Sequence, residues 1–391
     1  MATQLAAADV CESFTFRAAT RLLAGPGTIG ELGRVAREIG GSRVLVVSDP
    51  GVIAAGHTET GLRALQAAGC TTEVFSDFTE NPTTTQVEAG TAVARRFAPD
   101  LLVGLGGGSS MDSAKGINFL LCGGGLMRDY RGRGTTDLPL LPAIGCPTTA
   151  GTGSETQSFA LISDAETGEK LACGNPAAAF CVAILDPCLT LTQPARVTAL
   201  TGIDAVSHAV ESHVSTAATP ASRVFSREAW RLLAGHLPKV LADGNDLEAR
   251  AAVQQGAAWA GLAIENAMLG AAHALANPLT AAHGVAHGQA VGLMLPHVIR
   301  LNAAVAAAEY ADLAAVAGLA DCSAGGLADW IDKLLLRAGL ARSVRQAVNG
   351  QPAMIDLDAL AADAAKQWTG GFNPRPCTQA DLLAVYQEAA G

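Results

Sequence analysis

The residues best suited to chemistry are one aspartate and three histidines in the second half of the chain: Asp204, His208, His273 and His287. Asp204 and His208 are four residues apart, so on a helix their side chains leave the same face, one turn apart. His273 and His287 come from a later segment. Imidazole and carboxylate ligands suit Fe²⁺, Zn²⁺ or a similar first-row ion, and four protein ligands leave room for a substrate oxygen if the coordination shell expands.

Any one of these histidines alone would more often be structural, but their surroundings favour a shared role. His273 lies deep in an Ala-rich apolar segment, which we expect to form a helix that Pro278 ends. A buried imidazole with so few polar neighbours needs a partner. His287 stands at the start of the next predicted helix, from which its side chain can point back toward the first. The joint pattern therefore predicts a metal site.

A second candidate site is the glycine-rich turn Gly106-Gly107-Gly108-Ser109, which follows the apolar run 100–105 and precedes a predicted helix over about 110–121. Glycines allow close approach of the backbone, and the free N–H groups and dipole of a helix N-terminus favour an anion. We expect this turn to hold a pyrophosphate. Glycine-rich turns between a strand and a helix also occur for packing reasons, so this signal is weaker than the metal pattern.

Two further features point to a dinucleotide. The stretch Pro147–Glu155 combines hydroxyls with glycines after an apolar run, so it either lines the nicotinamide and phosphate side of a cofactor cleft or forms a flexible polar loop. Asp49, at the end of the apolar run 43–47, could accept hydrogen bonds from a ribose and repel a 2′-phosphate, which favours NAD over NADP. The alternative for Asp49 is a turn aspartate before Pro50.

The elements that must position these residues change character along the chain. The first half alternates β-rich runs with helical segments, which is typical of a parallel sheet with helices on both faces. Its predicted strands are 43–47, 72–75 and 100–105, and its predicted helices are 60–68, 84–97 and about 110–121.

The second half, from about Pro194, is long, Ala-rich and helical. We expect the domain boundary between Asp186 and Pro194, giving an α/β domain over 1–190 and an all-helical metal and substrate domain over 191–391. Breaks between its helices are expected at Pro220, Pro238, Pro278, Pro296, Gly325-Gly326 and Pro352.

Composition excludes several classes of partner. The formal net charge of −10 argues against nucleic acid or an anionic membrane. The nine cysteines are scattered and contain no Cys-x-x-Cys pair, which favours buried thiols in a reducing compartment. The N-terminus does not read as a secretory leader, and no apolar stretch reaches membrane-spanning length. We therefore expect a cytoplasmic protein.

The motifs together resemble the iron-containing (group III) alcohol dehydrogenases. The resemblance runs from about residue 14 to the C-terminus, with the motifs in the same order. It is carried by Gly106-Gly107-Gly108-Ser109-x-x-Asp112-x-x-Lys115, the stretch Pro147–Glu155, Gly202-x-Asp204-x-x-x-His208-x-x-Glu211, Asn266-x-x-x-Gly270-x-x-His273, His287-Gly288 and Leu295-Pro296-His297.

The resemblance implies a dehydroquinate synthase-like fold, with an α/β dinucleotide-binding domain, an all-helical metal domain and a cleft between them. It implies hydride transfer between NAD(P) and a small alcohol or aldehyde whose oxygen the metal binds, in a homodimer or larger homo-oligomer. It makes Asp204, His208, His273 and His287 the ligands of Fe²⁺ or Zn²⁺. The cofactor neighbours that the resemblance implies are Asn81, Gly107, Gly108, Ser109, Asp112, Thr148, Thr149 and Lys170. The glycine turn, the stretch Pro147–Glu155 and the strand end before Pro50 add Gly106, Thr152, Ser154 and Asp49 as candidates.

One position departs from the family pattern. Many members have a second histidine four residues after the third metal ligand, where this chain has Asn277. Asparagine hydrogen-bonds but does not titrate, so it cannot relay a proton. His283, expected in the connecting loop, is our candidate to take over that relay or to reshape the substrate pocket.

Three alternatives stay open at this point. A maleylacetate reductase or a 4-hydroxybutyrate dehydrogenase-like enzyme would act on a carboxylate-bearing substrate, and the sequence places no Arg or Lys beside the ligands to bind it. A dehydroquinate-synthase-like lyase is less favoured, because such enzymes typically use a glutamate with two histidines. A non-catalytic metal-binding protein of the same fold is the third.

Overall fold

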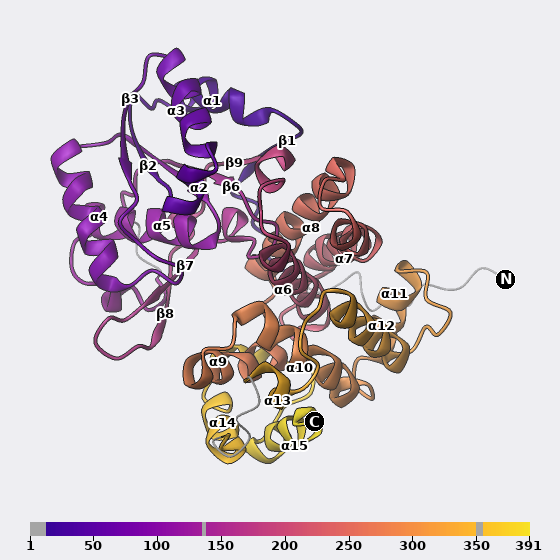
Figure 1. The fold of residues 1–391 in the computed structure, drawn as a ribbon. Helices are drawn as coiled ribbons and strands as arrows, with labels where there is room; N and C mark the ends of the chain where they lie inside the picture. The colour runs from indigo at the N-terminus through magenta and orange to yellow at the C-terminus, as the bar shows by residue number, and fades with distance from the viewer. Residues whose placement is uncertain (1–12, 135–137, 349–354) are drawn as a thin grey trace.

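The computed structural model describes residues 13–134, 138–348 and 355–391. An α/β part built from the first half of the chain lies against a helical part built from the second half (Figure 1). The structure therefore has both parts that the sequence predicts, a parallel sheet in the first half and a helical region in the second.

The described part of the first half forms a six-stranded sheet in which every pair of neighbours is parallel. Its strand order is β1-β9-β6-β4-β2-β3. The strands are β1 (Arg21–Ala24), β2 (Arg43–Val47), β3 (Thr71–Phe75), β4 (Leu101–Gly106), β6 (Ala143–Pro147) and β9 (Val182–Leu185).

Helices cover both faces of this sheet because its central strands are apolar on both sides. In β2, Val44 and Val46 pack into the cluster under α1 and α3, while Leu45 and Val47 pack into the cluster under α4 and α5. The helices of this part are α1 (Leu32–Glu38), α2 (Pro50–Ala54), α3 (His57–Ala67), α4 (Thr84–Phe97) and α5 (Gly108–Cys122).

The carboxyl edge of the sheet brings the two predicted cofactor segments together. Strand β4 ends at Gly106 and β6 ends at Pro147, and these two residues are partners in the register. The N–H of Thr148 donates to the carbonyl of Gly106 at 2.9 Å. A smaller sheet beside this edge contains β5 (Gly132–Arg133), β8 (Lys170–Gly174) and β7 (Phe159–Ser163), in that order.

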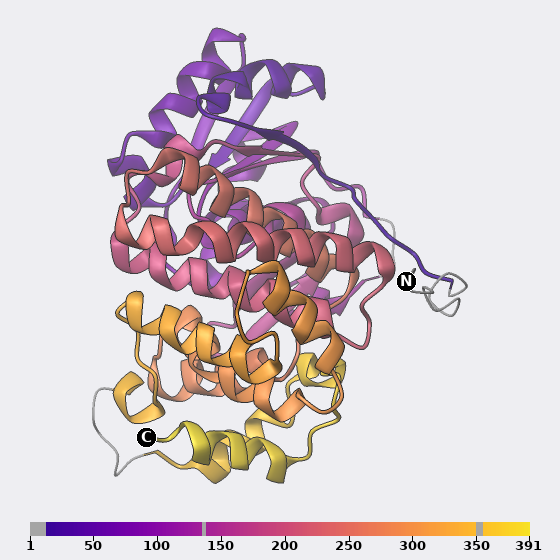
Figure 2. The same ribbon diagram turned by 90° about the vertical axis from the view of Figure 1, so that its right-hand side faces the viewer.

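The second half is helical throughout its described length, and its helices stack in layers below the sheet (Figure 2). One apolar core, in which Trp230, Tyr310 and Tyr386 are the largest buried side chains, runs through it. The helices are α6 (Ala195–Val214), α7 (Pro220–Ala242), α8 (Leu247–Asn266), α9 (Ala271–His283), α10 (His287–Asn302), α11 (Ala307–Val316), α12 (Ala324–Arg337), α13 (Val344–Ala347), α14 (Leu357–Ala364) and α15 (Gln379–Ala389).

Close backbone contact joins the two parts. A Cβ atom on Gly153 would lie 2.6 Å from the Cα atom of Gly261 in α8, so the stretch Pro147–Glu155 packs directly on that helix. Ser158 adds a bond from its N–H to the Glu265 carboxylate of α8 at 3.0 Å. The loop after β6 is therefore held on both sides and is not a free polar loop.

Several expected helix breaks were wrong. Pro238, Pro278 and Pro296 lie inside α7, α9 and α10. A proline removes one backbone donor and bends a helix, but neighbouring helices can hold the two halves together. The expected break at Pro220 is present, because α6 ends at Val214 and α7 begins at Pro220. Gly325-Gly326 lies in the first turn of α12. Pro352 lies outside the described residues.

The strands and helices predicted in the first half are all present, with ends that differ by up to three residues. The last strand of the large sheet ends at Leu185 and α6 begins at Ala195, while the domain boundary itself stays a prediction. Among the described helices, none combines the length and apolar character needed to cross a membrane. The expectation of buried thiols was wrong for Cys181 and Cys322, which are exposed.

Candidate metal and cofactor site

Three of the four predicted metal ligands, Asp204, His208 and His273, have ligand atoms that all lie within 4.8 Å of one another, and His287 approaches the same aspartate from outside this group. The Nε2 atoms of His208, His273 and His287 lie 3.4, 3.6 and 3.7 Å from the same oxygen, Oδ1 of Asp204. Ligands about 2.1 Å from a metal in a tetrahedral shell are separated by about 3.4 Å. Asp204, His208 and His273 are buried, whereas the His287 side chain is 30 % exposed and marks the open side of the site.

Three helices supply these side chains. Asp204 and His208 leave one face of α6, His273 lies in the first turn of α9, and His287 begins α10. The start of α10 lies close against α6, because a Cβ atom on Gly288 would be 2.1 Å from the carbonyl oxygen of Leu200. The glycine after His287 thus permits the approach that sets this imidazole beside Asp204.

The donor atoms fit a cation. Oδ1 of Asp204 and Nε2 of His273 are buried without a hydrogen-bond partner in the described structure, an arrangement that is costly unless another group binds there. Burial favours the uncharged form of Asp204, but the surrounding imidazoles outweigh it and hold the pKa of that carboxyl below its usual range. The site therefore combines one carboxylate with nitrogen ligands aimed at a common centre.

The histidines differ in their electrostatics. Burial lowers the pKa of His208. The pKa of the partly exposed His287 is lowered as well, because the burial of its ring and the charge of Lys170 both disfavour the protonated form. Burial also opposes the charged form of His273, but the carboxylates of Glu211 and Asp204 outweigh it and raise its pKa to about 9. Since metal ligands must be neutral imidazoles, metal binding would release a proton from this cluster.

Glu211 orients His273. Its Oε2 accepts a hydrogen bond from Nδ1 of His273, and its Oε1 accepts one from the N–H of Ala272 at 2.7 Å. A carboxylate on the far nitrogen of a ligating histidine fixes the tautomer that presents Nε2 to the metal. The sequence motif contained Glu211, but we assigned it no role. Its position, seven residues after Asp204 and three after His208, places it on the same helix face and could have suggested one.

The glycine turn is enclosed by the second predicted segment. A Cβ atom on Gly107 would lie 3.2 Å from Cγ2 of Thr149, and one on Gly108 would lie 2.8 Å from Cγ2 of Thr152. Helix α5 starts here with no side-chain cap, so its first N–H groups remain available to an anion. The geometry fits a phosphate group and shows that these glycines also serve packing.

A buried lysine holds the two segments together. Nζ of Lys115 donates to the carbonyl oxygens of Ser154, Gln157 and Phe159 at 2.7, 2.8 and 2.8 Å. The Ser154 hydroxyl in turn donates to Oδ1 of Asp112 at 2.8 Å. Burial lowers the pKa of Lys115 to about 8 and raises the pKa of Asp112. Asp112 and Ser154 were predicted to contact the cofactor, and here they also tie α5 to the loop.

The remaining predicted cofactor residues lie around the same edge. Asp49 caps α2 through Oδ1, which accepts from Gly51 N at 3.0 Å, while its Oδ2 accepts from the Ser110 hydroxyl at 3.1 Å. Asn81 receives a bond from Lys170 at 3.2 Å, and its N–H donates to the Ser109 hydroxyl at 3.3 Å. The position of Asp49 is therefore compatible with both interpretations, a turn residue that caps α2 and a residue beside the glycine turn.

Asn277 and His283 lie further along α9. Nδ2 of Asn277 donates to Oε1 of Gln367 at 3.0 Å, just before the 3₁₀ helix η8 (Trp368–Phe372). His283 is the last residue of α9, so its expected place in a loop was wrong. The helix continues through Pro278 and carries His283 ten residues past His273, about 15 Å along the axis.

Two family models match this chain and between them cover nearly all of it. Residues 19–187 match the iron-containing alcohol dehydrogenase model, and residues 198–390 match the C-terminal model of the Fe-containing alcohol dehydrogenase family. The fold and the convergent metal site thus define a metal-dependent oxidoreductase class. The chain belongs to the iron-containing alcohol dehydrogenase family.

Individual relatives agree with this assignment. The chain is 32 % identical over 376 residues to an NAD-dependent methanol dehydrogenase of Bacillus methanolicus, covering 93 % of this chain and 97 % of the relative. It is 33 % identical over 373 residues to a 1,3-propanediol dehydrogenase of Klebsiella pneumoniae, covering 93 % and 96 %.

Solved structures show the same fold. A 1,3-propanediol oxidoreductase has a TM-score of 0.92 at 32 % identity, covering 97 % of this chain and 100 % of that chain. A sulfoacetaldehyde reductase from Bifidobacterium kashiwanohense in complex with NAD⁺ has a TM-score of 0.89 at 28 % identity, covering 97 % and 99 %. The predicted family, fold class and enzyme class, an alcohol dehydrogenase, are confirmed.

Proposed function

We propose that this protein interconverts a small alcohol and its aldehyde or ketone, passing hydride between the substrate carbon and NAD(H) at the site of Asp204, His208, His273 and His287. The observation that carries the proposal is the convergence of three imidazole nitrogens on one aspartate oxygen, within 3.4 to 3.7 Å. A divalent ion held there would supply a positive charge that stabilises negative charge on the substrate oxygen.

The protein's own residues position the reactants. The α5 N-terminus, with Gly107 and Gly108 against Thr149 and Thr152, is our proposed seat for the pyrophosphate. Thr148 follows β6 at the same edge and is proposed to line the nicotinamide side. We propose NAD in preference to NADP because Asp49 would repel a 2′-phosphate, and the methanol dehydrogenase relative is NAD-dependent by name.

The position of Lys170 bears on the substrate. Lys170 bonds to Asn81 on the cofactor side and also lowers the pKa of His287, so it faces the region between the two halves of the site. The charge of Lys170 therefore acts on a proposed metal ligand, a placement that the sequence alone could not give. We assign Lys170 to the cofactor phosphates, and propose uncharged short alcohols and aldehydes as substrates.

Metal analysis combined with a screen for NADH consumption tests this proposal. Purified protein should contain about one Fe²⁺ or Zn²⁺ per chain and oxidise NADH with acetaldehyde or 3-hydroxypropanal. Succinic semialdehyde serves as the carboxylate-bearing comparison. Preference for the semialdehyde would redirect the substrate assignment, and NAD-dependent lyase chemistry without net NADH turnover would contradict it.

The ligand chemistry admits either metal, and we propose Fe²⁺ as the working metal because the family is named for it. We also propose a homodimer in the cytoplasm. Light scattering on a sizing column would show two chains per particle, and a monomer at working concentration would contradict the assembly.

A further inference from the structure

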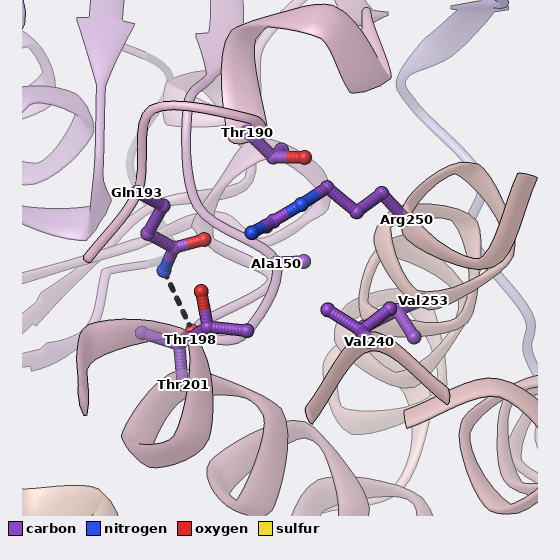
Figure 3. A pocket seen from close by; sticks show the side chains of 8 residues that line it. All are labelled: Ala150, Thr190, Gln193, Thr198, Thr201, Val240, Arg250 and Val253. Atoms are coloured by element: carbon purple, nitrogen blue, oxygen red, sulfur yellow. Dashed lines mark hydrogen bonds between the residues drawn. The ribbon is translucent and has the colours of Figure 1, made fainter. Parts of the chain in front are cut away.

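A small cavity lies where the start of α6, the helix α8 and the segment around Ala150 meet (Figure 3). The centre of a water-sized sphere can occupy about 10 Å³ of this cavity, so the cavity has room for one small molecule or ion. Its lining is Ala150, Thr190, Gln193, Thr198, Thr201, Val240, Arg250 and Val253. None of these residues is a proposed metal ligand, and of them only Ala150 belongs to the stretch Pro147–Glu155 that is predicted to line the cofactor.

Arg250 places a cation inside this cavity. The residue is only 4 % exposed, and among the described residues it forms no ion pair with a carboxylate. Within the part of the chain that the structure describes, its guanidinium donates one hydrogen bond, from Nε to the carbonyl oxygen of Gly244. The outer nitrogens of the guanidinium point into the cavity (Figure 3). Burial lowers the pKa of Arg250, because no neighbouring anion compensates the charge.

A second donor faces the same space. Thr198 is 6 % exposed, and its hydroxyl is buried without a partner in the described structure. It lies in the first turn of α6, a 20-residue helix, where the helix dipole adds positive potential. A hydroxyl without a hydrogen-bond partner and a guanidinium without an ion pair therefore meet at one cavity beside a helix N-terminus.

We propose that this cavity is a binding site for a single halide-sized anion, with chloride as its ligand. The guanidinium supplies the charge, and the Thr198 hydroxyl supplies an aligned donor. The opposite wall carries Gln193, whose Nε2 donates to the Thr201 hydroxyl at 3.0 Å and whose oxygen points toward Arg250 (Figure 3). Rotation of this amide would present its NH₂ group to the anion, with the Thr201 hydroxyl turning from the carbonyl oxygen of Val197 to donate to the amide oxygen.

The anion would connect three segments whose relative positions matter for the candidate active site. Helix α6 carries Asp204 and His208, α8 supports the stretch Pro147–Glu155 at Gly261, and Ala150 belongs to that stretch. Occupancy of the site therefore stabilises the contact between the two domains without touching the reacting groups. A small neutral molecule such as water would leave the charge of Arg250 uncompensated.

Thermal unfolding of the metal-loaded protein tests the site in solution. In sodium chloride, compared with sodium gluconate at the same ionic strength, the melting temperature should rise by about 2 °C for each tenfold excess of chloride over its dissociation constant. Arg250→Met keeps the length of the side chain and should abolish this rise. Thr198→Val keeps the shape and should move the rise to higher chloride. Arg231→Met, at an exposed pair with Glu228, should respond like the wild type.

Bromide diffraction locates the ligand directly. Crystals grown in bromide should show an anomalous peak between Arg250 and Thr198, and Arg250→Met crystals should lack it. An identical melting temperature in chloride and gluconate for the wild type would overturn the proposal. Density for water alone at that position, or a peak seen only in molar bromide without any effect of chloride in solution, would overturn it as well.

Discussion

Glu211 and His273 share a buried hydrogen bond, from Nδ1 of the imidazole to one oxygen of the carboxylate, while the second oxygen accepts the N–H of Ala272. The carboxylate therefore satisfies two donors of α9 from α6. This arrangement leaves Nε2 of His273 free to face Asp204, and Glu211 thereby holds a proposed metal ligand in place.

Glu211→Gln should weaken metal binding with little loss of fold. An amide offers one acceptor oxygen, so either Nδ1 of His273 or the N–H of Ala272 must face an NH₂ group. We expect metal affinity to fall by about 10- to 100-fold, measured by competition with a chelator. Glu228→Gln, at an exposed pair with Arg231, is the control. Unchanged metal affinity in Glu211→Gln would show that His273 needs no such partner.

Gly108→Ala should weaken cofactor binding while leaving the metal site intact. The added methyl group would meet Cγ2 of Thr152 at 2.8 Å and push the loop away from the α5 N-terminus. The dissociation constant for NADH should rise about tenfold, or about 1.4 kcal/mol, as measured by NADH fluorescence. Gly235→Ala, where a Cβ atom meets nothing within 4 Å, should bind NADH normally. Normal binding by Gly108→Ala would place the pyrophosphate elsewhere.

Glu155 should make the stability of the protein depend on pH. Burial raises the pKa of this carboxyl from 4.5 to about 7, so between those values the folded state holds a proton that the unfolded state releases. Its contribution to the free energy of unfolding is complete below pH 4.5 and is lost as the pH rises through 7. The difference corresponds to about 3 kcal/mol.

Urea unfolding of metal-loaded wild type and Glu155→Gln across this range measures the effect. The uncharged variant should match the wild type near pH 4.5 and exceed its stability above pH 7. Glu88→Gln, at an exposed position on α4, should follow the wild type at every pH. Parallel curves for the wild type and Glu155→Gln would mean that Glu155 stays ionised in the folded protein.

His283→Ala tests whether a proton relay passes through this residue. Such a relay would shift the pH dependence of kcat in the variant and reduce turnover, whereas a pocket role would change KM for the alcohol. The place of His283 at the far end of α9 favours the second result. The same pH profile, kcat and KM as in the wild type would remove His283 from the catalytic account. Asn277→His, which restores a titrating group beside Gln367, provides the comparison.

The closeness of the four proposed metal ligands could be predicted from sequence, because their residue types and spacing suggested a shared site. The i, i+4 relation of Asp204 and His208 needs only a helix to place both on one face. The sheet was predictable for a similar reason, since buried parallel strands are continuous apolar runs bounded by helices.

Features that depend on tertiary packing could not be predicted. Whether Pro278 ends a helix depends on the helices that hold both halves of α9, and no local pattern reports them. The bonds of Lys115 to three carbonyls and the approach of Gly288 to Leu200 likewise join segments far apart in the chain. For the same reason the unpaired guanidinium of Arg250 became visible only in three dimensions.

Metal removal and return is the measurement that tests the central claim most directly. Protein stripped with a chelator should still bind NADH but lose hydride transfer to a short aldehyde, and added Fe²⁺ or Zn²⁺ under anaerobic conditions should restore it. His273→Ala should bind NADH and remain inactive after metal is returned. Full turnover in metal-free protein, or in His273→Ala, would contradict the account.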